Sequence, residues 1–455
     1  MHRWRTAGRR RALAAGACAV AVALVATGCS GAGALFGDSD RQITVAMVSN
    51  SQMQDAVELS SQFTEETGID VKFVTLSENE ARAKITASVA TGGGEFDVVM
   101  ISNYETPMWG KYGWLVDLTP YMDATPGYDP DDFIPTLKTA LSYDGQMYAA
   151  PFYGESSFLM YNKRMFADRG VSLPENPTWP EVAEAAAELK TDKVSGICLR
   201  GKPGWGELLA PLDTVINAYG GRWYDEDWNA QFNTPEVRDA VKFYVDTVRE
   251  SGEPGAASSG FQECSNQLAQ GQTAMWYDAT SAVSVLENKD SSSIAGDVGY
   301  AQAPTMAKDG NGWLYTWALG IPTSSDKRDD AWKFISWMTS KEYIKYVVQK
   351  KGPESVPPGS RLSTYELPEV KKVAAPYAEQ MLSAMKAADQ KHATLKPVPY
   401  EGVQFLAIPE FQDLGTRVSQ QISAAIAGQI SVDEALDQSQ KYAEVVGKAY
   451  QEEQR

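Results

Sequence analysis

Histidine is almost missing from this chain of 455 residues, which contains only His2 and His392. Triad hydrolases and histidine-ligated zinc enzymes all need a histidine with partners. His392 lies in a polar stretch, residues 389–393, that is typical of a solvated surface. The motifs GxSxG, HExxH, GxxxxGK[ST] and GxGxxG are missing too. The sequence therefore predicts no cofactor, no metal site and no catalytic residue, and it leaves only carboxylate-pair chemistry as an enzymatic alternative.

Cysteine is scarce as well, with four residues in the whole chain. Cys18 lies in an apolar N-terminal run and Cys29 closely follows that run, so only Cys198 and Cys264 remain for the body of the chain. We expect these two to pair in an oxidising compartment, which the chain-entropy model values at about 4 kcal/mol. Two separate buried thiols are the alternative, whereas a metal site would need a second Cys pair or a His cluster.

Basic residues are outnumbered by acidic ones, 41 against 59. Five of the arginines precede residue 12, so the chain from residue 29 onward has 36 basic residues and a net charge of about −23. Such a surface repels phosphate backbones and anionic lipid headgroups. It excludes nucleic acid as a partner and membrane binding through a basic patch.

The longest apolar run covers residues 13–25 and is shorter than the ~20 residues that span a bilayer. The arginines precede it and Ala-Thr-Gly-Cys follows at residues 26–29, which is the order of a secretory signal peptide and its cleavage site. We therefore expect residues 1–28 to be removed and residues 29–40 to form a flexible tether.

Residues 26–29 also resemble the lipobox of bacterial lipoproteins. This resemblance implies that Cys29 is lipidated and that the protein is extracytoplasmic, anchored to the outer face of the cell membrane. Ala26 stands where the pattern prefers Leu, and a plain secretory signal with a chance cysteine is the alternative. The pair Arg10-Arg11 leaves both Sec and twin-arginine export open.

The chain after the tether starts with alternating strands and helices. Residues 43–48 and 69–76 are expected to form strands, residues 96–101 have the apolar run of a buried parallel strand, and helical spacing separates the three segments. This order predicts a doubly wound parallel sheet whose ligand binds beyond the carboxyl ends of its strands. Roughly 425 residues exceed a single hydrophobic core, so two lobes are expected.

Seven segments carry a resemblance to one known family. They are residues 78–82, 96–100, 104–111, 151–157, 220–223, 274–280 and 357–365. With the lipobox, they resemble the extracellular solute-binding proteins of bacterial ABC importers, in the carbohydrate family that includes maltose-binding protein. The segments other than 96–100 are most similar to the mannitol/sorbitol-binding branch, and the resemblance covers residues 42–450.

The resemblance implies an α/β fold of the two-lobed periplasmic-binding-protein type, with a ligand cleft between the lobes. We expect lobe 1 at residues 41–150 plus 295–345 and lobe 2 at residues 151–294 plus 346–455. The cleft is expected to close on its ligand by hinge bending. The closed form, expected to be a monomer, would then meet the transmembrane subunits of an ABC permease.

A polyhydroxylated ligand needs charged and amide partners for its hydroxyls and aromatic faces for its carbons. Glu155 lies in an aromatic, glycine-flanked segment at the first expected lobe crossing, and Asp278 follows an apolar run. Arg361 lies in a loop that two prolines stiffen. The alternatives are a solvated carboxylate for Glu155, a helix N-cap for Asp278 and an exposed salt bridge for Arg361.

Five more candidates come from topology and from the aromatic residues. Glu78 and Asn79 follow the second predicted strand and Tyr104 follows the third, which places them near the cleft. An acidic residue at a helix start could instead serve only the helix dipole. Trp205, with glycines on both sides that let a ligand approach closely, and Trp317 are candidate stacking surfaces.

The sequence thus predicts a protein that binds a sugar alcohol of the mannitol, sorbitol or arabinitol type for an ABC importer. A mono- or oligosaccharide is the alternative ligand, since carboxylates and aromatic faces serve both. A secreted glycosidase that uses Glu155 and Asp278 as its carboxylate pair is the alternative from another class.

Overall fold

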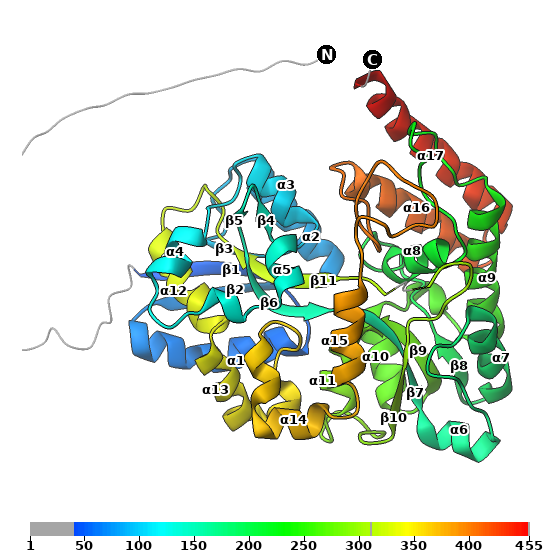
Figure 1. Ribbon diagram of the computed structural model, residues 1–455, viewed down its shortest axis with the longest axis horizontal. Helices are drawn as coiled ribbons and strands as arrows, with labels where there is room; N and C mark the ends of the chain where they lie inside the picture. Colours follow the sequence, from blue (N-terminus) through cyan, green and yellow to red (C-terminus); the bar gives the residue numbers. More distant parts are fainter. Residues whose placement is uncertain (1–40, 310–311, 454–455) are drawn as a thin grey trace, which may run out of the picture. The chain divides into compact units, whose positions relative to one another are not determined.

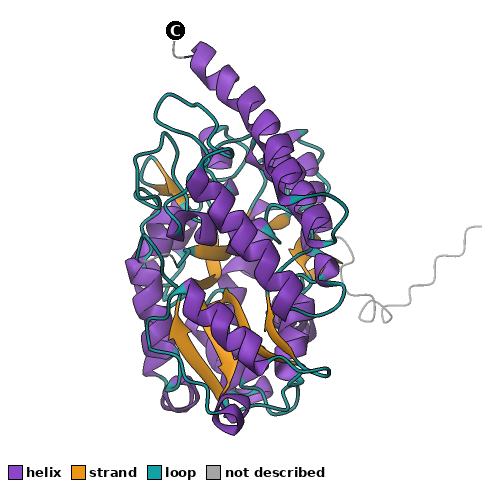
Figure 2. Cartoon of the chain, turned by 90° about the vertical axis from the view of Figure 1, so that its right-hand side faces the viewer, coloured by secondary structure: helices purple, strands orange, loops and turns teal. Residues whose placement is uncertain are grey.

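The structure is a computed structural model that describes residues 41–309 and 312–453. The predicted signal peptide, the predicted tether and Cys29 lie outside the described residues. Two separate sheets organise the chain (Figure 1). Figure 2 shows the helices packed around the strands. Among the described residues, no helix combines the length and the apolar character that crossing a membrane requires.

The first sheet contains the β-α-β-α-β unit that the sequence predicts. Its strand order is β2-β1-β3-β11-β6, in which β1, β2 and β3 are parallel and β11 runs antiparallel to both of its neighbours. The bounds are β1 Gln42–Val48, β2 Asp70–Leu76, β3 Val98–Ser102, β6 Ala150–Glu155 and β11 Tyr315–Gly320. The predicted α/β class is confirmed.

Local chemistry sets the ends of the first helix, α1 (Ser51–Thr67). The side chain of Asn50 accepts a hydrogen bond from the backbone N–H of Met53 at 3.0 Å, which caps the helix start. Gly68, at φ +70°, ends the helix in the left-handed conformation that glycine adopts without a Cβ penalty. The short cap lets the carboxyl end of β1 and the start of α1 lie together at one edge of the sheet.

The second sheet has the order β10-β7-β9-β8, with β8 parallel to β9 and the other pairs antiparallel. Its strands are β7 Ser157–Asn162, β8 Ser195–Cys198, β9 Thr273–Ala279 and β10 Val298–Gln302. A single residue, Ser156, separates β6 of the first sheet from β7 of the second. The first crossing between the lobes is therefore abrupt, and it follows residue 155, whereas the expected boundary follows residue 150.

The helices of at least six residues complete the architecture. After α1 they are α2 Glu78–Ala90, α3 Glu105–Lys111, α4 Thr119–Ala124, α5 Pro135–Ala140, α6 Lys163–Arg169, α7 Trp179–Leu189, α8 Leu209–Ala218, α9 Pro235–Ser251, α10 Phe261–Ala269, α12 Arg328–Met338, α13 Lys341–Lys351, α14 Pro368–Ala374, α15 Ala378–Ala387, α16 Phe411–Ile426 and α17 Val432–Glu453.

Short elements make up the remainder. They are the hairpin β4 Ser142–Tyr143 with β5 Gln146–Met147, the four-residue α11 Val283–Leu286, and the 3-10 turns η1 Pro130–Asp132, η2 Ala256–Ser258, η3 Thr280–Ala282, η4 Pro353–Ser355 and η5 Leu362–Glu366.

Besides residues 151–155, which belong to β6 of the first sheet, two further parts of the chain differ from the expected boundaries. Residues 295–345 are divided, because β10 pairs with β7 in the second sheet whereas β11 pairs with β3 and β6 in the first. The segment after residue 345 is divided too. Residues 346–374 remain with the first lobe, where α13 packs on α1 and α12. The later helices belong to the second lobe: α15 packs on β7 and β10, and both α16 and α17 pack on α9. Local periodicity identifies strands and helices but not their distant partners.

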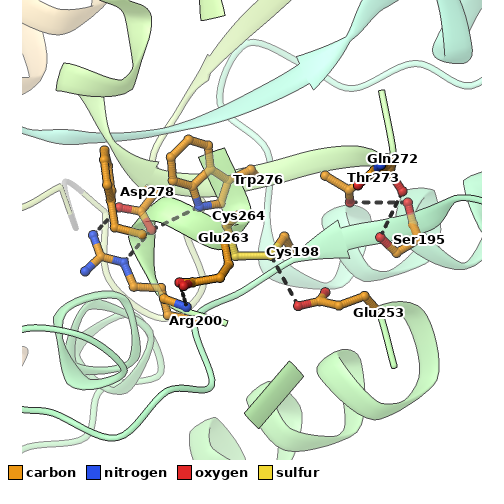
Figure 3. Close-up of a disulfide and its surroundings, with 12 residues drawn as sticks. Ser195, Cys198, Arg200, Glu253, Glu263, Cys264, Gln272, Thr273, Trp276 and Asp278 are labelled. Carbon is orange, nitrogen blue, oxygen red and sulfur yellow. Dashed lines mark hydrogen bonds and ion pairs between the residues drawn. A yellow bond between two sulfur atoms is a disulfide. The ribbon is translucent and has the colours of Figure 1, made fainter. Parts of the chain in front are cut away.

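Cys198 and Cys264 are joined by a disulfide, with their Cα atoms 5.5 Å apart (Figure 3). Cys198 ends β8, and Cys264 lies in the first turn of α10. Both cysteines are fully buried. The disulfide therefore ties the end of a strand to the start of a helix, and Arg200, two residues after Cys198, and Glu263, next to Cys264, line the cavity described below.

Candidate functional site

A cavity of about 500 Å³ lies between the two sheets, within the size range of small-molecule sites. The first lobe contributes the carboxyl ends of β1 and β2, the start of α2, and side chains of β6 and β11. The second lobe contributes the segment after β8, the start of α10 and Ser281. Among the charged and aromatic lining residues are Glu78, Glu80, Arg82, Tyr153, Glu155, Arg200, Lys202, Trp205, Glu207, Phe261, Glu263, Trp313, Tyr315 and Trp317.

Arg82 lies at the centre of the first lobe's contribution. Its guanidinium carbon is 4.1 Å from the ring centroid of Trp205 and 4.5 Å from that of Trp317, so the cation lies over both indoles. Nη2 donates to Oε1 of Glu78 at 2.8 Å and to the hydroxyl of Tyr315 at 2.5 Å. The side chain is buried. The arrangement presents a fixed set of donors next to aromatic surface.

Arg200 is the corresponding cation of the second lobe. It follows β8, lines the cavity and forms a two-pronged ion pair with Asp278, in which Nε donates to Oδ2 at 2.7 Å (Figure 3). Nη1 also donates to the carbonyl of Gly206 at 2.9 Å and lies 3.4 Å from a carboxylate oxygen of Glu207. A planar fork held at several points is preorganised for hydrogen bonding.

Asp278 does not face the cavity. It is completely buried and accepts hydrogen bonds from Arg200, from the indole N–H of Trp276 at 3.0 Å and from the backbone N–H of Ala279 at 2.7 Å. The structure therefore corrects the prediction that Asp278 binds the ligand directly. Its carboxylate orients Arg200, and Arg200 contributes to the wall of the cavity.

Glu155 ends β6 at the lobe crossing and lines the cavity, and its role in ligand binding stays a prediction. The side chain is buried, and it accepts a hydrogen bond from the hydroxyl of Ser281 in the second lobe at 2.5 Å. Burial raises the pKa of Glu155 from 4.5 to about 8, and the nearby charges of Asp278 and Glu78 add to that rise. The hydrogen bond from Ser281 and the charge of Arg200 oppose it. A protonated carboxyl group of this kind can donate a hydrogen bond to a ligand hydroxyl.

Glu78 and Asn79 start α2, but only Glu78 lines the cavity. The amide of Asn79 instead donates to the carbonyl of Pro203 at 3.0 Å and so joins the two lobes. Gly204 has φ +149°, and a Cβ there would lie 2.5 Å from Oδ1 of Asn79; a Cβ on Gly206 would lie 2.6 Å from Oε1 of Glu78. The glycines around Trp205 therefore let the side chains at the start of α2 approach the backbone closely, in addition to any ligand.

Trp205 and Trp317 both line the cavity, where their role as stacking surfaces stays a prediction. Tyr104 does not. Its ring centroid is 4.8 Å from that of Trp205, and its hydroxyl donates to the carbonyl of Ile408 at 2.8 Å. Tyr104 thus supports the back of Trp205 and is not part of the cavity wall.

Arg361 is placed away from the cavity, and its assignment as a ligand residue is corrected. It is completely buried, and its guanidinium donates to the carbonyls of Thr339, Asp129 and Tyr128, each at 2.8 Å. Asp132 pairs with it at 3.3 Å. These bonds join the segment after α13 to the first lobe, so the role of Arg361 is structural.

Arg82, Arg200 and Glu207 are the buried charged residues of the cavity wall that the sequence reasoning missed. Arg82 could have been found, because it lies four residues after Glu78 and so shares its helix face. Arg200 and Glu207 follow a short strand in a glycine-rich segment, which in the sequence looks like an ordinary loop. Only the long-range pairing of β8 with β9 brings that segment to the cavity.

The family of the chain agrees with this geometry. The family model of bacterial extracellular solute-binding proteins matches residues 47–345. The chain belongs to this family, and the two-lobed fold with a cavity between its sheets agrees with it. Membership places the protein outside the cytoplasm, among solute-binding proteins of transport systems and not among enzymes.

Particular relatives narrow the comparison. A mannitol-binding protein from Pseudomonas aeruginosa is 43% identical over 411 residues, which cover 90% of this chain and 93% of the relative. An ABC transporter solute-binding protein from Agrobacterium vitis, solved with bound D-mannitol, is 47% identical with a TM-score of 0.87 and covers 90% of this chain and 99% of its own. An erythritol/L-threitol-binding protein from Mycolicibacterium smegmatis is 27% identical and covers 68% of this chain and 69% of the relative.

The raised pKa of Glu155 predicts a measurable pH dependence of stability. Because the folded state holds this proton up to about pH 8 and the unfolded state releases it near 4.5, the stabilising contribution is complete at low pH. It is lost as pH rises through that window, by at most about 1.4 kcal/mol per pH unit. Glu155→Gln should therefore gain stability relative to the wild type as pH rises, measured by urea unfolding between about pH 5 and pH 8. A constant difference across these pH values would contradict the assignment.

Proposed function

We propose that this protein captures an open-chain sugar alcohol of the mannitol, sorbitol or arabinitol type in the cavity between its lobes and delivers it to the permease of an ABC importer. One observation carries the proposal. Buried ionisable groups from both lobes, Arg82, Glu155 and Arg200, converge on one cavity lined with indoles. Such groups bind the hydroxyls, and the indoles cover the carbon chain.

The relatives support a polyol in particular. The protein of known structure that shares 47% identity holds D-mannitol, and the two curated relatives are named for mannitol and for erythritol/L-threitol. All three ligands are open-chain sugar alcohols. The relatives that share 43% and 47% identity are the one named for mannitol and the one solved with D-mannitol, so mannitol is the first ligand to test.

The position of Arg82 favours a polyol over a stacked saccharide. A pyranose ring typically lies against an exposed aromatic face, but here the guanidinium lies over both Trp205 and Trp317 at 4.1 and 4.5 Å. The indole surfaces that a sugar ring would use are thus shared with a cation. A narrow, flexible carbon chain needs less of that surface and gains more from the charged donors.

The glycosidase alternative is not supported by the geometry. A carboxylate pair must flank one bond of the substrate, whereas Asp278 is completely buried behind Arg200 and only Glu155 lines the cavity. Asp278 is also fully engaged in its ion pair and two further hydrogen bonds. We therefore assign a binding role to Glu155, as a hydrogen-bond partner of the ligand.

A titration by calorimetry tests the proposal, with mannitol, sorbitol, arabinitol and maltose as ligands. The wild type should bind at least one of the three polyols and bind it more tightly than maltose. Trp317→Ala should weaken that binding by about 1–3 kcal/mol, because it removes aromatic surface and the support of Arg82. Trp337→Ala is the matched control, since this half-buried indole of α12 does not line the cavity.

Two outcomes would contradict the proposal. Tight binding of maltose without binding of any polyol would assign the cavity to saccharides. Equal affinity of Trp317→Ala and the wild type would remove Trp317 from the binding surface.

We further propose that a lipid on Cys29 anchors the monomeric protein beside its permease. The support is the arrangement of residues 1–29, with arginines, an apolar run and a small-residue cleavage site, together with a family that works outside the cytoplasm. A tethered receptor remains close to its transporter and raises the local concentration of bound ligand there.

Cell fractionation tests the anchor. Cys29→Ser should move the protein from the membrane fraction to the soluble extracytoplasmic fraction, because the acceptor thiol of the lipid is lost. Cys18→Ser, which changes the same residue type within the apolar run, should leave the protein on the membrane. Membrane association of Cys29→Ser equal to that of the wild type would show that no lipid on Cys29 holds it.

A further inference from the structure

Carboxylates outnumber cations around the cavity. Glu78, Glu80, Glu155, Glu207 and Glu263 line it, against Arg82, Arg200 and Lys202. Two further carboxylates, Glu105 and Asp278, contact the arginines from behind the cavity wall. The excess of negative charge remains when Glu155 is counted as neutral.

Each of the three lining cations is already paired with protein carboxylates. Arg82 lies 2.8 Å from Glu78 and 3.4 Å from Glu105. Arg200 pairs with Asp278 and, at 3.4 Å, with Glu207, and the amine of Lys202 lies 3.4 Å from the other oxygen of Glu207. None of these three cations is left to neutralise an anion carried by a ligand.

Negative charges from the two lobes also act on one another across the cavity. Glu78 belongs to α2 and Glu207 to the segment after β8, and a Cβ on Gly206 would lie 2.6 Å from Oε1 of Glu78. Burial raises the pKa of Glu207, and the charge of Glu78 is the next largest cause. A positive group placed between the two lobes would relieve this repulsion, and a negative group would add to it.

We propose that the cavity selects its ligand by charge: it binds neutral polyols, admits polyols that carry an amine, and rejects those that carry a carboxylate or a phosphate. This selectivity rests on the proposed polyol-binding function. Its physical basis is that an ion buried without a partner loses its hydration with no compensating contact. An ammonium group would find carboxylate acceptors, whereas a carboxylate would find cations whose partners are already in place.

Three ligands with the same six-carbon chain and configuration isolate the effect of charge. They are D-mannitol, 1-amino-1-deoxy-D-mannitol and D-mannonate, titrated calorimetrically at neutral pH. The Kd of mannonate should be at least 30 times that of mannitol, and the Kd of the amine should lie within tenfold of mannitol. A mannonate Kd less than 30 times that of mannitol, or an amine Kd outside that range, would overturn the proposal.

A pair of variants separates the local charge from the net charge of −18. Glu207→Gln removes one lining carboxylate and should lower the Kd ratio of mannonate to mannitol at least threefold. Glu188→Gln makes the same change at an exposed position of α7 that does not line the cavity, and it should leave the ratio unchanged. Equal ratios in the two variants would overturn the proposal.

Two further measurements keep the result unambiguous. Thermal unfolding of Glu207→Gln shows whether the variant folds. Glu78→Gln removes a lining carboxylate of the opposite lobe, and it should also lower the Kd ratio of mannonate to mannitol at least threefold. If mannitol itself does not bind the wild type, the proposed function fails. If mannitol binds and mannonate binds equally well, only the charge selectivity fails.

Discussion

The buried ion pair between Arg200 and Asp278 is the interaction on which the site depends. Two charges removed from water are stable only if geometry and further hydrogen bonds compensate for their lost hydration. Here the indole N–H of Trp276 and the backbone N–H of Ala279 donate further hydrogen bonds to the carboxylate of Asp278. The guanidinium of Arg200 donates further hydrogen bonds to the carbonyl of Gly206 and to the carboxylate of Glu207. The pair thereby ties the segment after β8, which includes Trp205, to the end of β9. The bond from Asn79 to Pro203 holds the same segment against the start of α2.

The same constraint explains why two lobes with different sheets make one binding surface. Arg82 of the first lobe lies over Trp205 of the second, Asn79 bonds to Pro203, and Glu155 bonds to Ser281. Each contact joins a charged or amide group of one lobe to a group of the other. A ligand with many hydroxyls can replace or extend such contacts, so closure of the cleft and recognition of the ligand use the same chemistry.

The sequence predicts the individual strands and helices of this fold, but it does not predict which of them pair over long distances along the chain. The strands at 43–48, 69–76 and 96–101 match β1, β2 and β3, because strands and amphipathic helices have different local periodicities. β1 and β3 are largely buried, whereas β2 is a partly exposed edge strand. The expected lobe boundary near residue 295 does not match the sheets. The pairing of β10 with β7 depends on contacts more than a hundred residues apart, which leave no local pattern.

In the candidate site too, some residues can be predicted from their local sequence, whereas the roles of others depend on distant contacts. Glu78, Glu155, Trp205 and Trp317 could be predicted, since topology and flanking aromatic or glycine residues point to the cleft. Arg361 could not be distinguished from a ligand residue, because a proline-stiffened loop is equally suited to a buried structural arginine. Asp278 lies one layer behind the predicted surface, and only its pairing with Arg200 reveals its role.

The central claim is that charged groups of both lobes meet on one polyol. A crystal structure of the complex with mannitol tests it most directly. The account predicts one mannitol molecule in the cavity, with hydroxyls hydrogen-bonded to at least one charged side chain of each lobe, Arg82 or Glu155 on one side and Arg200 or Glu207 on the other. Mannitol bound outside this cavity, or contacting the charged groups of one lobe alone, would contradict the account.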